Sequence, residues 1–161
     1  MIPDSILRRL EHQGCSPRIG DDEKVREVLA ELGIPSGCEL AECLLRYDPS
    51  DFLSDTAHEQ LMDVVVPVAE GEEPVPFDAW DTPIGMATQF VREVWELPDT
   101  LICLTSCEGE GAYLYDIVSG AVYDFDLGER SEFVSGKLAP PWKSYFEFLD
   151  WYLSARRSWT K

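Results

Sequence analysis

Basic side chains are nearly absent from the middle of this 161-residue chain. Of its 31 acids and 13 Lys and Arg, residues 47–129 contain nineteen acids and one base, Arg92, which leaves twelve of each for the remainder. The net charge of −18 therefore belongs entirely to the middle segment. Such a chain repels nucleic acid phosphates and anionic membranes and attracts basic partners or cations. An acidic face that only aids solubility explains the excess about equally well.

Histidine and closely paired cysteines are also scarce. The chain has two histidines, His12 and His58, and its five cysteines include no CxxC pair. Cys38 and Cys43 would lie about 140° apart around a helix axis, so they cannot both face one ion. We expect these thiols to be small buried side chains, with no metal or cofactor. Cys107 with His58 is the only nucleophile–base pair that the sequence suggests, and no local motif supports it, so we expect no enzyme activity.

Long apolar runs are missing as well. The longest, Val64–Ala69, is interrupted by Pro67 and is far too short to span a membrane. The first twenty residues carry charges and lack the apolar core of a signal peptide. An odd number of cysteines without an export signal is typical of free thiols in a reducing compartment. We therefore expect a cytoplasmic protein.

The N-terminal half of the chain has helical periodicity. Residues 1–20 are expected to be a variable arm or a short helix. Gly33 occupies the left-handed position after a helix whose buried stripe is Val25, Val28, Leu29 and Leu32. Ser36 and Glu39 have the spacing of a capping box for the next helix, which would bury Leu40, Cys43, Leu44 and Tyr47. Leu61–Val68 is rich in β-branched residues and predicts a strand at a sheet edge.

The C-terminal half combines strands with two helices. After Asp81 or Thr82, a helix is predicted with a core face of Ile84, Ala87, Phe90, Val91, Val94 and Trp95. Strands follow at Leu101–Leu104, Ala112–Val118 and Ala121–Leu127, the last two joined by a hairpin at Ser119-Gly120. Pro140-Pro141 should open the last helix, whose aromatic stripe is Trp142, Tyr145, Phe146, Phe148, Leu149, Tyr152 and Leu153. We predict a single α+β domain over residues 1–161, mostly antiparallel β-sheet in hairpins or a meander packed with about four helices.

Five short motifs occur in a characteristic order. They are Glu31-Leu32-Gly33-Ile34, the segment Leu97–Leu104 that begins with Leu-Pro, Gly109–Asp116, Ser119-Gly120-Ala121-Val122-Tyr123 and Ser144–Leu149. The ordered set, which extends from about Asp21 to Leu153, resembles the SUKH superfamily, named for immunity proteins and a yeast cell-wall regulator. The resemblance implies a SUKH-like α+β fold.

The resemblance also implies a function. Members of this superfamily are largely bacterial immunity proteins that bind a cognate toxin, often a nuclease or a deaminase, and block it. It therefore implies a non-catalytic protein without cofactors whose partner is a basic toxin encoded nearby. The alternative is a regulatory or scaffolding domain that binds another protein and has no toxin partner.

Clustered carboxylates can occupy the basic groove in which such a toxin holds its polyanion. The candidate partner-binding residues are Glu70, Glu72, Glu73, Asp78, Trp80, Asp81, Glu108, Glu110, Asp124 and Asp126. Two alternatives stay open at this point: Trp80 is somewhat more consistent with core packing, and Asp124 and Asp126 could equally be a solvated strand face or bind a cation.

Overall fold

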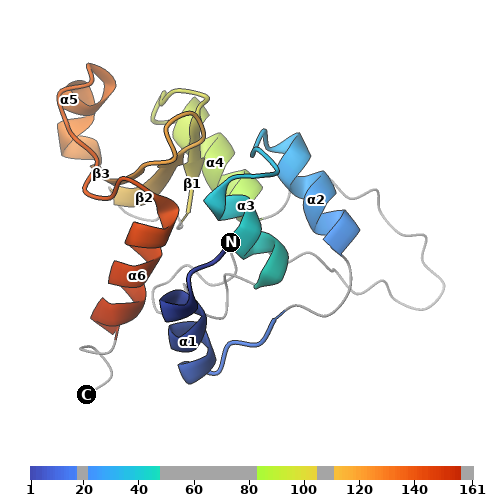
Figure 1. Ribbon diagram of the computed structural model, residues 1–161. Coiled ribbons are helices and arrows are strands. Elements are labelled where there is room, and N and C mark those ends of the chain that lie inside the picture. The colour runs from blue at the N-terminus through green and yellow to red at the C-terminus, as the bar shows by residue number, and fades with distance from the viewer. Residues whose placement is uncertain (18–21, 48–82, 105–110, 157–161) are drawn as a thin grey trace.

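Helices make up more of the structure than strands do. The computed structural model (Figure 1) describes residues 1–17, 22–47, 83–104 and 111–156. Its elements in chain order are α1 (Asp4–His12), α2 (Asp22–Glu31), α3 (Glu39–Arg46), α4 (Pro83–Glu93), β1 (Leu101–Cys103), β2 (Gly111–Asp116), β3 (Val122–Asp126), the 3₁₀ turn η3 (Leu127–Glu129), α5 (Arg130–Val134) and α6 (Tyr145–Arg156).

These residues form a single α+β domain, so the predicted class is confirmed. The prediction of a mostly antiparallel sheet with about four helices is wrong, because the described part has six α-helices and only three strands. The strands are short, with three, six and five residues. The predicted strand at Leu61–Val68 lies outside the described residues. None of the described helices is long and apolar enough to cross a membrane.

The sheet is antiparallel with the order β1-β2-β3. Tyr115 of β2 lies opposite Val122 of β3, and the hairpin predicted at Ser119-Gly120 is confirmed. Gly120 adopts a φ of +79° and donates its N–H to the carbonyl of Asp116 at 2.8 Å. The backbone of Trp142 adds an isolated antiparallel bridge on the outer side of β3, with the Val122 N–H donating to its carbonyl at 3.0 Å.

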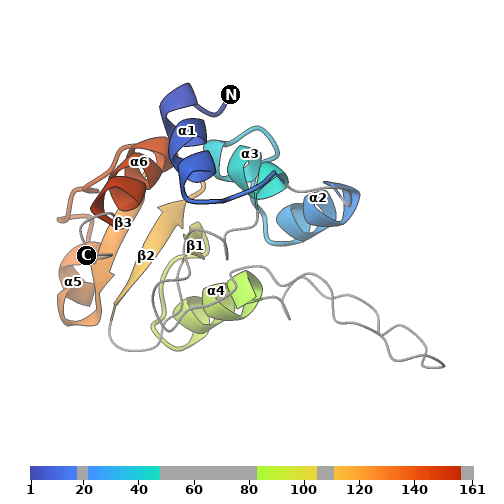
Figure 2. The same ribbon diagram turned by 90° about the horizontal axis from the view of Figure 1, so that it is seen from below.

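Helices cover both faces of the sheet (Figure 2). The two faces are separated because successive side chains of a strand point to opposite sides. One face packs Ile102, Tyr115 and Val122 into a core with α1, α3 and α6. The other packs Cys103, Leu114 and Phe125 against α4 and against Phe133 of α5. Helix α5 was not predicted, since its five residues are too few to show a periodic stripe.

The predicted end of α2 is confirmed. Gly33 has a φ of +78° and donates its N–H to the carbonyl of Ala30 at 3.1 Å, while the Ile34 N–H donates to Leu29 at 2.9 Å. This pair of bonds is a Schellman motif, in which the left-handed residue favours glycine. Ile34 and Leu29 are both buried, so the motif also contributes an apolar contact. The predicted stripe of α2 is buried throughout.

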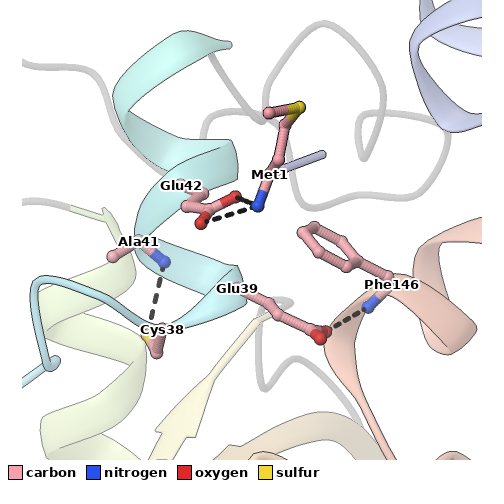
Figure 3. Close-up of polar contacts among 6 residues, drawn as sticks. All are labelled: Met1, Cys38, Glu39, Ala41, Glu42 and Phe146. Carbon is pink, nitrogen blue, oxygen red and sulfur yellow. Dashed lines mark hydrogen bonds and ion pairs between the residues drawn. The ribbon is translucent and has the colours of Figure 1, made fainter. Parts of the chain in front are cut away.

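The capping box predicted at the start of α3 is wrong. The cap residue is Cys38, whose Sγ accepts the Ala41 N–H at 3.4 Å (Figure 3). The carboxylate of Glu39 instead accepts the Phe146 N–H in the first turn of α6, at 3.0 Å from Oε2. Free N–H groups at a helix start attract a carboxylate, and α6 brings such a group close to Glu39. Glu42 of the same helix binds the amino group of Met1 at 2.9 Å.

The last helix begins later than predicted, at Tyr145 rather than Pro140-Pro141. Trp142 is held in its bridge to β3 and therefore precedes the helix. The predicted helical core residues Tyr145, Phe148, Leu149, Tyr152 and Leu153 are buried, and Phe146 is half-buried.

The core face of α4 is largely as predicted, with Ile84, Ala87, Val91 and Trp95 buried. The assignment of Val94 to the core face is wrong, because Val94 lies in the turn after Glu93 and is 60% exposed.

Candidate functional site

The two described carboxylates among the predicted site residues lie together on β3. Asp124 and Asp126 are exposed and alternate with the half-buried Tyr123 and the buried Phe125, as the sequence predicts. In the sheet register Asp124 lies directly opposite Tyr113 of β2. Opposed residues in an antiparallel pair point to the same side, so both carboxylates share the sheet face on which α6 packs.

The two carboxylates differ in what surrounds them. Partial burial, and secondarily the charge of Asp126, raise the pKa of Asp124 above its ordinary value. The Asp126 carboxylate accepts the Gly128 N–H at 2.8 Å and so caps η3. The ion pairs within the described residues are Met1–Glu42, Arg9–Asp150 and Arg130–Glu96. No base in that part of the chain therefore neutralises Asp124.

An aromatic cluster adjoins Asp124, because Tyr113, its partner across the sheet, belongs to it. The ring centroids of Trp142 and Trp151 are 4.7 Å apart, and Tyr113 lies 5.8 Å from the first and 6.1 Å from the second. The side chain of Trp151 is 40% exposed, and Tyr113 and Trp142 are half-buried. We call Tyr113, Asp124, Asp126, Trp142 and Trp151 the aromatic–acidic surface.

Contacts with β3 and α6 hold this surface in place. The bridge fixes Trp142 beside Val122. Val122 is two residues before Asp124 and lies on the same face of β3. Diagonal neighbours across strands are about 7–8 Å apart, within reach of an indole ring. Phe148 of α6 is fully buried beneath the cluster, with its ring centroid 5.1 Å from both Tyr113 and Trp142. The surface therefore rests on packed core, and Trp142, which lies in the connection between α5 and α6, is fixed by its bridge to β3.

Sequence reasoning missed the aromatic part of this surface. Trp142 was assigned to the core stripe of the last helix, and Tyr113 and Trp151 were not singled out. The available signal was the position of Trp151, which falls outside the buried stripe of α6. Exposed Trp side chains are enriched among the residues that dominate protein–protein contacts.

The other predicted site residues lie outside the described residues. They are Glu70, Glu72, Glu73, Asp78, Trp80, Asp81, Glu108 and Glu110. The same holds for Cys107 and His58, the pair considered for nucleophilic catalysis.

Three of the described cysteines, Cys15, Cys43 and Cys103, are buried, and Cys38 caps α3. The Cys43 side chain is 1% exposed, and burial, followed by the charges of Glu42 and Glu39, raises the pKa of its thiol far above the ordinary value. A thiol in such surroundings is a poor nucleophile because the thiolate is the reactive form. Across residues 1–17, 22–47, 83–104 and 111–156 there is no group of three or more His, Cys, Asp or Glu side chains able to hold a metal ion.

A surface hollow of about 360 Å³ beside α4 is a weaker candidate. Its described lining consists of Gln89, Arg92, Glu93 and Asp99. The Arg92 guanidinium donates to the carbonyl oxygens of Asp99, at 2.6 Å, and Leu101, at 3.2 Å. Arg92 thus fastens the end of α4 to the start of β1, and the mixed charges of the lining select no class of ligand.

Comparison with known proteins found no relative: no family model, no curated protein and no solved structure matches this chain. The function must therefore be inferred from the residues, the sequence resemblance and the aromatic–acidic surface.

Proposed function

We propose that this chain is a cytoplasmic, non-catalytic immunity protein with a SUKH-like fold that binds and neutralises a cognate toxin. The toxin is a basic effector of the nuclease or deaminase type, and binding uses an acidic surface. The observation that carries the proposal is the carboxylate of Asp124, which has no cationic partner among the described residues and lies on the aromatic–acidic surface of a chain with a net charge of −18.

The agreement between the motifs and the elements supports the fold part of the proposal. Glu31–Ile34 forms the end of α2, and Leu97–Leu104 runs into β1. Residues 111–116 of the third motif are β2, and Ser119–Tyr123 is the hairpin turn with the start of β3. In Ser144–Leu149, Ser144 directly precedes α6 and the other five residues are the start of that helix. Each motif therefore coincides with an element boundary or a paired strand.

Electrostatics supports the toxin-binding part. An enzyme that acts on nucleic acid holds its substrate in a basic groove, and an acidic partner is attracted to the same groove. Complementary charges raise association rates up to about 10⁸–10⁹ M⁻¹s⁻¹ at low salt, which suits a protein that must capture a toxin before it acts. The excess of acids over residues 47–129 supplies the long-range field, and Asp124 supplies a described contact point.

A growth assay tests the proposal. The protein encoded by the neighbouring gene is expressed under an inducible promoter, with and without this chain, and a tag on the chain reports co-purification. We expect the neighbouring gene product alone to stop growth, and co-expression of the chain to restore it and yield a complex. If the neighbouring product is harmless, or if co-expression protects nothing, the immunity function is wrong. A stable complex without any toxicity favours the regulatory or scaffolding alternative.

Charge reversal identifies the contribution of the surface. Asp124→Lys should lower the association rate constant at low salt and flatten its dependence on ionic strength, because one attractive charge becomes repulsive. Glu27→Lys is the matched control, since Glu27 is an exposed carboxylate on α2, on the opposite side of the molecule from β3 in both views. Equal association rates for the two variants would remove Asp124 from the interface.

A further inference from the structure

The aromatic–acidic surface combines indole rings with a carboxylate, and one cationic side chain of a partner can bind both. Its two indole side chains are partly exposed, and its Asp124 carboxylate has no cationic partner among the described residues. A cation is attracted to the face of an indole when it lies within about 6 Å of the ring centroid. A planar guanidinium additionally stacks on the ring while it donates hydrogen bonds in its own plane to a carboxylate.

The geometry of the surface fits such a group. Tyr113, directly opposite Asp124 in the sheet, has its ring 5.8 Å from that of Trp142 and 6.1 Å from that of Trp151. Directly opposed residues have Cβ atoms about 4.5–5.5 Å apart, so the carboxylate stands at the edge of the aromatic cluster. Because the cluster rests on the buried ring of Phe148, its rings are held in position before a partner arrives.

We propose that Trp142, Trp151 and Asp124 form a docking site for an arginine side chain of the basic partner. The guanidinium stacks on an exposed indole face and donates to the Asp124 carboxylate, while Asp126 contributes its charge. The inference rests on the proposed function for the identity of the partner. The attraction of a cation follows from the charge of the Asp124 carboxylate, and the preference for arginine follows from the stacking of a planar guanidinium on an indole ring. Partial burial raises the pKa of Asp124 because it disfavours the charged form of the carboxylate. An arriving cation stabilises that charged form, which adds to the binding free energy.

A titration with short peptides tests the site without the toxin. The probe is hexa-arginine, with hexa-lysine at the same ionic strength as the comparison, and the readout is the indole N–H signals in ¹H–¹⁵N NMR spectra. Trp142→Phe and Trp151→Phe assign the two signals. We expect both to shift and saturate with hexa-arginine, while the signal of the buried Trp95 stays in place. Hexa-lysine should bind about threefold more weakly, because an ammonium group does not stack on a ring.

Substitutions make the outcome specific. Asp124→Asn should raise the dissociation constant for hexa-arginine about threefold or more, whereas Glu27→Gln removes one charge from the exposed side of α2 and should change it by less than about 1.5-fold. The site is refuted if the Trp142 and Trp151 signals do not move, if the two peptides bind equally, or if the two variants behave alike.

The peptide result and the growth assay are independent of each other. Protection in the growth assay with unmoved indole signals would keep the immunity function and refute this site. Shifted indole signals without protection would keep the arginine site and refute the immunity function.

Discussion

Glu39 should stabilise two helices at once, and its removal should cost more than the loss of an ordinary surface carboxylate. Its side chain starts from the first residue of α3 and accepts the Phe146 N–H at the start of α6, 107 residues away in sequence. A hydrogen bond to a charged group contributes about 1.5–3 kcal/mol, and a carboxylate near a helix N-terminus about 0.3–1 kcal/mol. Because Phe146 is only half-buried, water replaces part of the lost bond in the variant.

We therefore expect Glu39→Ala to lower the free energy of unfolding by about 2 kcal/mol. Glu39→Gln should lose about half as much, since the amide oxygen can still accept the Phe146 N–H but carries no charge. In a domain of this size, about 1 kcal/mol lowers the melting temperature by roughly 2–4 °C. Urea unfolding followed by far-ultraviolet circular dichroism, together with calorimetry, measures both quantities.

Glu42→Ala is the matched control, because Glu42 lies on the same helix and its partner is the exposed amino group of Met1. Its effect should stay within about 0.5 kcal/mol, the usual range for surface substitutions. If Glu39→Ala costs no more than Glu42→Ala, the bond between Glu39 and α6 does not hold the two helices together and the reasoning is refuted.

Three further variants test separate parts of the structure. Gly33→Ala should lower the free energy of unfolding by about 1 kcal/mol in urea, since Gly33 has a φ of +78° and an added Cβ meets nothing within 4 Å. Tyr145→Phe should leave stability unchanged or raise it by about 1 kcal/mol, because the buried Tyr145 hydroxyl has no hydrogen-bond partner among the described residues. Asp124→Asn should raise the melting temperature at pH 7, and the gain should vanish by about pH 3, below the ordinary Asp pKa of about 3.9.

The sign of the Asp124 effect follows from its raised pKa. The folded state binds the Asp124 proton more tightly than the unfolded state does. Ionisation of Asp124 at higher pH therefore lowers the free energy of unfolding, and the asparagine variant, which does not ionise, avoids this loss. A gain that persisted at pH 3 would mean that something other than charge is responsible. Likewise, an unchanged Gly33→Ala stability would contradict the strain at Gly33, and a loss of more than about 1 kcal/mol in Tyr145→Phe would show that its hydroxyl is bonded.

Local patterns predicted the elements that depend on neighbouring residues. The stripe of α2, its glycine stop and the hairpin at Ser119-Gly120 each need only a few adjacent positions, and each was predicted. Predictions failed where a distant segment competes for a group. Glu39 has the spacing of a capping box, yet it bonds to α6, and Trp142 follows two prolines that suit a helix start, yet it pairs with β3.

In the candidate site, too, the features set by neighbouring residues were predicted and those set by distant segments were not. The exposure of Asp124 and Asp126 follows from the period of two along β3 and was predicted. The gathering of Tyr113, Trp142 and Trp151 depends on the sheet register and on how α6 packs, and neither can be read from one segment. The arginine site therefore became visible only with the fold.

The most direct test of the immunity function is a titration of activity. The purified product of the neighbouring gene is assayed on nucleic acid, or on a nucleobase substrate if it is a deaminase, with increasing amounts of this chain. We expect activity to fall linearly with added chain and to vanish at a fixed, small molar ratio of the chain to the toxin. Glu27→Lys should behave like the natural sequence, and Asp124→Lys should be needed in excess. Full activity in the presence of a large excess of the chain would contradict the immunity function.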